Sequence, residues 1–393
     1  MKILQVIHSV DPQAGGTTEA LKQLSLELAR QGVDVGVLSL DPSDAPWLPD
    51  FPLRVTALGP ASKKRGGYGY TPRALPWLLE HGREYDFIVV NGLWQYGGFA
   101  VWRAARRIGV PYVVFPHGML DPWFKRYYPL KHLKKWCYWP WGEYRVLRDA
   151  AAVLFTSEEE RLDARQSFWL YRCREEVAGF GIESPPEIGP EIFLQKFPAL
   201  AGRRLLLFLG RLHEKKGCDL LLRAFHEVTS GNSADKAPHL VIAGPAGNAY
   251  AGEMRMLAAQ LGLDDRHITW TGMVTGDLKW SAFRAADFFV LPSHQENFGV
   301  SAVEALACRC PVLLSNKVNI AREVAEDGAG LVENDDLPGT RRLLERWLDL
   351  DPEGRARHRN SARPCFERRF RISQMAARFT TLLEKLPGDS RET

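Results

Sequence analysis

Short apolar runs alternate with longer amphipathic segments along most of this chain, and no other feature of the sequence limits the possible folds as strongly. Strands that are apolar on both faces are typical of parallel sheets covered by helices, because such sheets have no polar face. The alternation runs through the first half of the chain and starts again in the second. The sequence therefore predicts an α/β protein with two parallel-sheet domains.

The expected strands are short and almost entirely apolar. They cover residues 3–7, 33–39, 87–91, 112–116 and 152–155 in the first half, and 205–209, 239–243, 268–271, 288–291 and 312–314 in the second. Apolar residues recur at helical spacing over 17–30, which predicts a helix, and a last helical stretch is expected over 361–385. The polar tail after it is expected to fray.

The stretch 179–190 is rich in glycine and proline, so neither a helix nor a central strand is expected to pass through it. We therefore interpret it as an interdomain linker. The predicted domains are 1–182 and 183–365, followed by a C-terminal helix and tail over 366–393. A chain of 393 residues also exceeds what one hydrophobic core usually organises.

Composition excludes several classes of protein. No apolar run approaches the roughly 18 residues of a membrane span, and the first residues lack the features of a secretory signal, so a cytoplasmic location is expected. The net charge of +4 is too small to indicate nucleic-acid binding. The six cysteines lack the spacing of metal ligands, and Cys308 and Cys310 are expected to be small buried apolar residues.

A glycine turn separates the first expected strand from the first expected helix. In DPQAGGTT, residues 11–18, Gly15 and Gly16 leave the backbone open to close approach. The helix that follows offers unpaired amides and the positive end of its dipole, so a phosphate is a suitable ligand. The alternative is that the junction needs glycine for steric reasons alone.

The segment GRLHEKKG, residues 210–217, follows the first strand of the second half. Arg211 can make bidentate contacts with a diphosphate, and Lys216 supplies a second positive charge. Together they could neutralise departing negative charge without a metal. The alternative is a solvated charged turn.

The segment SHQENFGVSAVEALA carries the most specific pattern in the chain. Glu296 follows the expected strand 288–291, and Glu304 lies eight residues later on the next expected helix. Open α/β sheets bind ligands at the carboxyl ends of their strands, and carboxylates accept hydrogen bonds from sugar and ribose hydroxyls. Gly299 lets the backbone approach a ligand. A surface ion pair is the alternative interpretation.

His117 lies in FPHGMLDPW, also at the end of an expected strand. A histidine beside glycine at that edge is a candidate catalytic residue, and the alternative is a packing or surface role.

The segment 123–148 interleaves lysine and arginine with tryptophan. Tryptophan prefers the headgroup region of a membrane, and basic residues attract anionic lipid, so this segment is a candidate membrane-docking surface. The alternative is that these aromatic residues pack in a core. Pro129 and Pro140 interrupt any continuous amphipathic helix.

Taken together, PSHQENFGVSAVEALA, GRLHEKKG and the AGG turn resemble the retaining glycosyltransferases of GT-B fold, group one or family four, over residues 1–370. PHGMLDPW and PVLLSNKVNIAREV are similar to the branch found in bacterial exopolysaccharide and lipopolysaccharide synthesis. The resemblance implies two Rossmann-like domains facing across a cleft, with a C-terminal helix that crosses back to the acceptor-binding first domain. Docking through segment 123–148 would place the first domain on the inner face of the plasma membrane.

The resemblance further implies roles for particular residues. Gly16, in the turn with Gly15, would give a backbone amide to the donor diphosphate, Arg211 and Lys216 would hold that diphosphate, and Glu304 would bind the ribose. Glu296 would contact the transferred sugar, and His117 would face the reacting centre. The amides of Asn297, Phe298 and Gly299 would complete the site, and the backbone near Met273 and Val274 would meet the base.

The implied reaction transfers a hexose from a nucleoside diphosphate to a hydroxyl of a glycan or lipid-linked acceptor, with retention and without a cofactor. A DxD pattern occurs only at Asp349 and Asp351, far from the cationic segment, so no divalent metal is expected. The nucleotide stays open between UDP, GDP and ADP. A nucleotide-sugar epimerase and a noncatalytic sugar-nucleotide-binding protein remain alternatives. Two departures from the family pattern, Arg309 and the GFGIES linker, concern local loop geometry.

Overall fold

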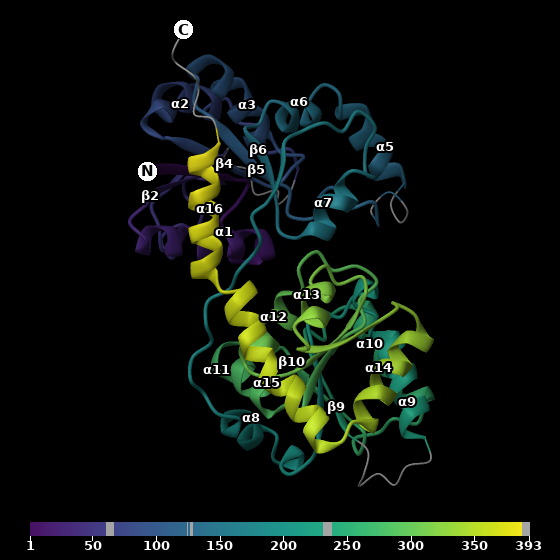
Figure 1. The fold of residues 1–393 in the computed structure, drawn as a ribbon. Coiled ribbons are helices and arrows are strands. Elements are labelled where there is room, and N and C mark those ends of the chain that lie inside the picture. The colour runs from purple at the N-terminus through teal and green to yellow at the C-terminus, as the bar shows by residue number, and fades with distance from the viewer. Residues whose placement is uncertain (60–66, 124, 126–128, 231–237, 387–393) are drawn as a thin grey trace. The chain divides into compact units, whose positions relative to one another are not determined.

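The computed structural model describes residues 1–59, 67–123, 125, 129–230 and 238–386, so the expected frayed tail lies outside the described residues. The chain divides into two compact units. Unit 1 is Met1–Gly181 together with Ile372–Thr393, and unit 2 is Ile182–Arg371. Each unit is a parallel sheet with helices on both faces, so the prediction of an α/β protein with two Rossmann-like domains is confirmed (Figure 1).

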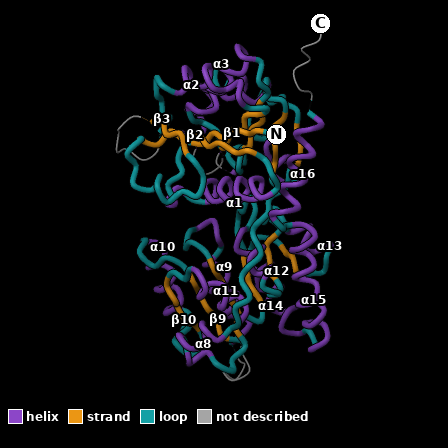
Figure 2. The backbone as a smooth tube through the Cα atoms, turned by 90° about the vertical axis from the view of Figure 1, so that its left-hand side faces the viewer, coloured by secondary structure: helices purple, strands orange, loops and turns teal. Residues whose placement is uncertain are grey.

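In unit 1 the described strands form a seven-stranded parallel sheet. Its order is β3 (Val55–Gly59), β2 (Asp34–Pro42), β1 (Lys2–Ile7), β4 (Phe87–Asn91), β5 (Tyr112–Phe115), β6 (Ala152–Phe155) and β7 (Glu175–Val177). Its helices are α1 (Gly16–Arg30), α2 (Ala74–His81), α3 (Tyr96–Ile108), α5 (Pro129–Tyr138), α6 (Glu143–Arg148), α7 (Glu158–Ala164) and α16 (Ile372–Lys385). Figure 2 shows β1, β2 and β3 as a layer between α1 and the pair α2 and α3.

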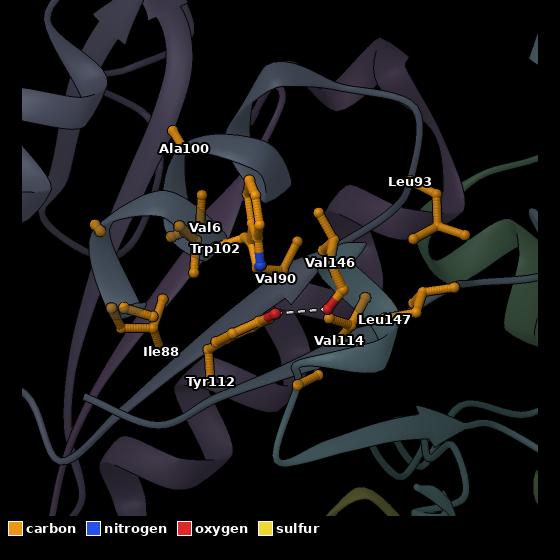
Figure 3. Packing of buried hydrophobic residues seen from close by; sticks show 14 of the residues in the cluster. Val6, Ile88, Val90, Leu93, Ala100, Trp102, Tyr112, Val114, Val146 and Leu147 are labelled. Atoms are coloured by element: carbon orange, nitrogen blue, oxygen red, sulfur yellow. Dashed lines mark hydrogen bonds between the residues drawn. The ribbon is translucent and has the colours of Figure 1, made fainter. Parts of the chain in front are cut away.

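Successive residues of the central strands point to opposite faces of this sheet, which is why the strands are apolar throughout. Val90 of β4 belongs to the core beneath α3, whereas Val89 belongs to the core beneath α1 and α16. Figure 3 shows Val90 among the first set, where the Tyr112 hydroxyl donates a hydrogen bond of 2.6 Å to the carbonyl of Val146.

The last helix, α16, belongs to unit 1 although it follows the whole of unit 2 in the sequence. Met375, Phe379 and Leu383 lie on one face of α16 and are buried against Leu24 of α1 and Phe115 of β5. The apolar face of α16 therefore completes the cover of the unit 1 sheet, and the prediction of a C-terminal helix that returns to the first domain is confirmed.

Unit 2 repeats the architecture with a six-stranded parallel sheet among the described residues. The order is β10 (Ile268–Gly272), β9 (His239–Ala243), β8 (Leu205–Leu209), β11 (Phe288–Leu291), β12 (Val312–Ser315) and β13 (Gly330–Glu333). Its helices are α8 (Glu191–Lys196), α9 (Cys218–Thr229), α10 (Ala249–Gln260), α11 (Gly276–Ala285), α12 (Val300–Ala307), α13 (Ala321–Glu326), α14 (Leu337–Asp349) and α15 (Pro352–Arg369).

Two expectations about helices and aromatic residues are wrong. The stretch 361–385 is not one helix, because α15 ends at Arg369 and the backbone of Arg371 pairs with Ile182 before α16 begins. Trp139 is not available to a membrane, because its ring is fully buried in the core and its indole N–H donates to the carbonyl of Trp169 at 2.8 Å. The interpretation of Cys308 and Cys310 as buried apolar residues is confirmed.

Candidate functional site

In unit 2, the strand order reverses between β8 and β11, and the segments that leave these neighbouring strands carry the charged residues singled out above. Lys216 lies after β8, and Glu296 lies after β11. Open parallel sheets bind ligands outside the carboxyl ends of their strands at such a reversal. The fold therefore places both residues where a ligand is expected.

Lys216 and Glu296 form an ion pair, with the ammonium of Lys216 on one carboxylate oxygen. The two side chains are 19% and 18% exposed, so the pair is partly shielded from water. Gly217 explains how the two segments come so close. Its φ is 64°, and a β-carbon on it would lie 2.1 Å from the carbonyl oxygen of Pro292 in the segment that leads to Glu296.

The backbone of Glu296 is fixed on both sides. Its N–H donates to the carbonyl of Lys317 at 3.0 Å, and its carbonyl accepts from the N–H of Asn319 at 3.1 Å. Gly299 precedes α12 with φ 81°, a left-handed conformation that favours glycine. The loop that carries Glu296 is therefore preorganised by the neighbouring loop after β12.

Glu304 lies on α12 and forms an ion pair of 2.6 Å with Lys279 of α11. The ammonium of Lys279 also lies 4.1 Å from the ring centre of Trp280. Sequence reasoning missed Lys279, because it is one lysine in an ordinary amphipathic helix and no motif marks it. The carboxylate proposed to bind a ribose thus already has a cationic partner.

The remaining predicted residues of unit 2 differ in exposure. Arg211 is exposed, and no hydrogen bond or ion pair holds it within the described part of the chain. Met273 is 69% exposed just after β10, whereas Val274 is buried. The side chain of Phe298 is buried and packs edge-on against Phe370, which leaves its backbone as the part open to a ligand.

Arg309 and the DxD pattern have structural explanations. Arg309 follows α12 with φ 60° and is exposed, so it occupies the left-handed position after a helix that glycine usually fills. Asp351 caps α15 by accepting a hydrogen bond of 2.6 Å from the N–H of Gly354. Among the described residues, no three His, Cys, Asp or Glu side chains gather where they could hold a metal ion.

In unit 1, the glycine turn lies at the start of α1. Gly15 has φ 101° and ψ −151°, a region essentially restricted to glycine. Gly16 has no such conformation, and a β-carbon on it would meet no described atom within 4 Å. The residue at the N-cap of this 15-residue helix is Gly15, which has no side chain to cap the first amides.

His117 lies just after β5 with φ 50°, and the next residue is also left-handed, with φ 73° at Gly118. The imidazole Nε2 lies 3.2 Å from Oδ1 of Asn91, the last residue of β4. The amide nitrogen of Asn91 donates to Gln5 at 2.8 Å and lies near the carbonyl of Val89. Because that environment fixes the amide, Nε2 of His117 carries the hydrogen, and Nδ1 is the acceptor.

Burial lowers the pKa of His117 to about 4, so the imidazole is neutral at physiological pH. Its turn is held by Glu160 of α7, which accepts hydrogen bonds from the N–H of Gly118 at 2.5 Å and from Thr156. Burial raises the pKa of Glu160. Glu143 of α6, which is also buried, holds the turn after β4 in a similar way. Its carboxylate accepts a hydrogen bond of 2.6 Å from the N–H of Trp94, whose backbone is in the left-handed conformation.

Sequence reasoning also missed a cavity of about 860 Å³ at the same edge of the unit 1 sheet. Its walls include residues from the ends of β1, β2 and β4 and from the glycine turn. The lining includes His8, Asp11, Asp41, Asp44, Trp47, Tyr68, Tyr70 and Gln95. They come from separate segments without a shared motif, so only the fold shows that they share one cavity.

Two parallel α/β units, joined by a linker and a returning helix, form the GT-B fold. The model described as "Glycosyl transferases group 1" matches residues 191–363, and the model described as "Glycosyl transferase 4-like domain" matches residues 15–177. The chain therefore belongs to the group 1 glycosyl transferases.

Individual relatives agree with this assignment. A protein of Mycolicibacterium smegmatis named D-inositol 3-phosphate glycosyltransferase is 28% identical over 381 residues, which cover 88% of this chain and 81% of the relative. Anabaena HepE, solved in complex with UDP-glucose, has a TM-score of 0.74 at 18% identity, covering 98% of this chain and all of HepE. WaaG, a glycosyltransferase involved in lipopolysaccharide biosynthesis, has a TM-score of 0.68 at 16% identity, with coverage of 98% and 100%.

Proposed function

We propose that this glycosyltransferase moves a hexose from a nucleoside-diphosphate sugar to a hydroxyl of a glycan or lipid-linked acceptor, with retention of configuration. The observation that carries the proposal is the position of Lys216 and Glu296 together at the strand reversal of unit 2. HepE, which shares the fold, has been solved with UDP-glucose, so a nucleotide sugar is the donor class that this site supports best.

In this proposal Arg211 and Lys216 hold the donor diphosphate, and the amide of Gly16 adds a further donor of hydrogen bonds. Glu296 contacts the transferred sugar. Glu304 binds the ribose, and a hydrogen bond from the ribose then replaces part of its contact with Lys279. Backbone amides of residues 297–299 complete the sugar site, and the backbone near Met273 and Val274 meets the base.

The chemistry requires positive charge where the phosphate leaves. The bond between the anomeric carbon and the phosphate oxygen breaks, and a bond from that carbon to the acceptor oxygen forms on the same face. The proton of the acceptor hydroxyl passes to the leaving phosphate oxygen. Arg211 and Lys216 stabilise that phosphate, so the proposal needs neither a protein nucleophile nor a divalent metal.

The acceptor binds unit 1 in this proposal, with the neutral imidazole of His117 near the reacting hydroxyl. We further propose a place in bacterial surface polysaccharide synthesis, as the similarity to WaaG suggests. An epimerase acts on the donor alone and has no use for an acceptor cavity. A noncatalytic binding protein would also use Arg211 and Lys216 to hold a diphosphate, so turnover of the donor is the observation that separates it from an enzyme.

We also propose that segment 123–148 docks unit 1 on the inner face of an anionic membrane. None of the helices among the described residues is long and apolar enough to span a bilayer. On α5, however, Leu130, Leu133 and Trp136 are exposed at spacings that put them on one face of the helix. The sequence has no acidic residue between Asp121 and Glu143.

Turnover of UDP-glucose by the purified chain with membrane extract tests the enzymatic proposal. We expect Lys216→Ala and Glu296→Ala each to lower kcat/KM at least about a hundredfold, since each removes a charge at the reacting centre. Lys215→Ala, which removes a charge from the same turn, is the matched control and should retain most activity. Wild-type transfer by either test variant at an unchanged melting temperature would remove that residue from the site.

Two further experiments separate the proposed enzyme from a metal-dependent enzyme, an epimerase and a noncatalytic binding protein. Transfer should continue in excess EDTA, and activity that is lost there and restored by magnesium or manganese would overturn metal independence. Donor incubated without acceptor should yield no isomerised sugar, whereas an epimerase would produce it. If UDP, GDP and ADP sugars are all left intact in the presence of extract, the chain is a noncatalytic binding protein.

A further inference from the structure

One side chain of β1 departs from the apolar pattern of the central strands. Gln5 stands in the middle of KILQVI, between Leu4 and Val6, and is fully buried. Burying an amide costs free energy unless the amide is hydrogen-bonded, so apolar packing does not account for glutamine here. The reason for glutamine at this position therefore lies in the groups that its amide contacts.

The strand register puts Gln5 in one row with Asn91 and His117. Gln5 lies opposite Val89 of β4, and Asn91 is two residues further along the same strand. Residues two apart on a strand share a face of the sheet, so Gln5 and Asn91 share the face beneath α1 and α16. The same step leads from β4 to β5, where Asn91 lies opposite Phe115 and His117 follows two residues later. The row thus runs diagonally from the middle of β1 to the turn after β5.

Two hydrogen bonds connect the members of this row. Oε1 of Gln5 accepts from Nδ2 of Asn91 at 2.8 Å, and Oδ1 of Asn91 lies 3.2 Å from Nε2 of His117. The nitrogen of Asn91 also lies 3.4 Å from the carbonyl of Val89 and 3.5 Å from that of Val6, and carbonyl groups only accept. Because these two contacts are long, the bond to Gln5 is the one that holds the amide of Asn91.

The amide nitrogen of Gln5 makes no comparable contact. It is buried and has no hydrogen-bond partner among the residues that the structure describes. A buried N–H group without a partner destabilises a fold, and leucine or methionine would fill a similar volume without that cost. Stability therefore does not explain Gln5, whereas the bond from its oxygen to Asn91 does.

We propose that Gln5 is a positioning residue of the transfer reaction. From the core it fixes the amide of Asn91 with the oxygen toward His117. This keeps the hydrogen of the imidazole on Nε2 and leaves Nδ1 to accept a hydrogen bond from the acceptor hydroxyl. The inference rests on the proposed function, which gives His117 its place near that hydroxyl. Gln5 itself is fully buried and acts only through Asn91.

Nitrogen-15 NMR of the full-length chain, labelled at histidine, tests this inference because it reports which imidazole nitrogen carries the hydrogen. The pKa of His117 is about 4, so its imidazole is neutral at pH 7 and its tautomer can be read there. The variant His117→Gln identifies its signals among those of the ten histidines. We expect the wild-type chain to show the Nε2–H form. Gln5→Leu should convert about half of His117 or more to the Nδ1–H form, because the released Asn91 amide can turn its nitrogen toward the ring.

Steady-state kinetics give a second readout. Gln5→Leu should lower kcat at least about tenfold and change KM for the donor less than about twofold, because Lys216 and Glu296 are intact. Gln5→Met, which is unbranched like glutamine, should behave in the same way and guards against a leucine variant that folds poorly. Melting temperatures close to that of the wild type show that the variants fold.

Two controls separate the hydrogen bond from burial of a polar group. Gln5→Glu should keep the wild-type tautomer and rate, because burial keeps the new carboxyl protonated and its carbonyl oxygen can accept from Asn91. Ser25→Ala removes another buried polar group, from α1, whose hydroxyl has no hydrogen-bond partner in the described part of the chain. It should change neither the tautomer nor kcat.

A His117 that stays in the Nε2–H form in both Gln5→Leu and Gln5→Met would overturn the inference. A changed tautomer with an unchanged kcat would also overturn it. Because the tautomer is measured without substrate, the inference and the proposed function fail separately. A wild-type chain that is inert toward every nucleotide sugar refutes the enzymatic proposal, and the NMR result still decides whether Gln5 orients His117.

Discussion

Gly15 and Gly16 are neighbours with different physical reasons to be glycine. The backbone angles of Gly15 are closed to other residues, whereas those of Gly16 are not. Space does not demand glycine at Gly16 either, because an added β-carbon would meet no described atom within 4 Å. The conformation of the turn therefore explains Gly15, and close approach of a ligand is the remaining explanation for Gly16.

This difference gives a matched pair of variants. Gly16→Ala should leave the melting temperature unchanged or slightly raised, because alanine favours the first turn of a helix, and should raise KM for the donor at least about tenfold. Gly15→Ala should lower stability by about 1–3 kcal/mol, because alanine is strained in that region. Thermal unfolding and steady-state kinetics on both variants check this. An unchanged KM in Gly16→Ala would remove the turn from the donor site.

His117 and Asn91 are hydrogen-bonded to each other at the ends of adjacent strands. The Asn91 amide holds the imidazole as the Nε2–H form and leaves Nδ1 as an acceptor. Because the pKa of His117 is about 4, this form should be present throughout the neutral range. The same low pKa makes stability fall as the pH drops from 6.5 to about 4, since the unfolded imidazole takes up a proton there and the folded one does not.

Replacing Asn91 with aspartate should reverse this arrangement. A carboxylate beside Nε2–H favours the imidazolium, so the pKa of His117 should rise well above 4. The pH profile of kcat/KM should then show a new fall on its acidic side. Asn91→Leu removes the acceptor without adding a charge, and should lower kcat with no new limb. Imidazole titration by NMR and pH profiles check both variants. A wild-type pH profile in Asn91→Asp, with His117 still titrating near 4, would contradict the positioning role of Asn91.

The elements that the sequence predicted well are those buried on both faces. β4, β6, β8, β9 and β11 have the expected limits, because a run of four or five residues that is almost entirely apolar is best buried as a central strand. The strands that were missed, β3, β7 and β13, lie at or near sheet edges, and β7 has the sequence EEV. Their pairing is decided by neighbouring strands, which local pattern does not reveal.

In the candidate site, too, some features could be predicted from the sequence and others could not. Arg211, Lys216, Glu296 and Glu304 were predicted because each lies at a fixed distance from a recognisable strand. The Lys216–Glu296 contact was not predicted, because it depends on the close approach of Gly217 to Pro292 across 75 residues of sequence. Long-range contacts of this kind follow from the order of strands in the sheet.

The returning helix α16 gives a prediction at the level of elements. Phe379→Ala should destabilise unit 1 by about 3–5 kcal/mol, because Phe379 is fully buried against Phe115. Glu384→Ala, on the exposed side of α16, should change stability by less than about 0.5 kcal/mol. Hydrogen exchange measured by mass spectrometry is the suitable test, since it reports on each unit separately.

We expect Phe379→Ala to speed exchange in β4 and β5 of unit 1 and to leave β8 and β11 of unit 2 as protected as in the wild type. Equal loss of protection in both sheets would show that the two units unfold together. Unchanged exchange in β4 and β5 would contradict the role of α16 in the core of unit 1.

For the whole molecule, the small net charge of +4 conceals a local excess of positive charge on α5. No residue of α5 is buried, and its exposed apolar face continues to Trp169, whose ring lies 5.8 Å from that of Trp136. Lys131 and Lys134 are exposed beside that face, whereas Lys135 packs over Trp94 at 4.6 Å. The first two lysines are therefore the ones that an anionic lipid surface would meet.

Co-sedimentation with vesicles that contain phosphatidylglycerol tests the docking of this surface. The wild-type chain should pellet at low salt, and replacing Lys131 and Lys134 with glutamate should release it, because each basic residue near anionic lipid contributes about 1 kcal/mol. The control makes the same charge change on unit 2, with glutamate at the exposed positions Lys196 and Arg223, and should still pellet. Leu133→Ser should weaken vesicle binding by a similar factor at low and at high salt, because it removes an apolar side chain that inserts into the lipid and changes no charge. Equal partitioning of the α5 variant and the wild type would show that this surface does not dock on lipid.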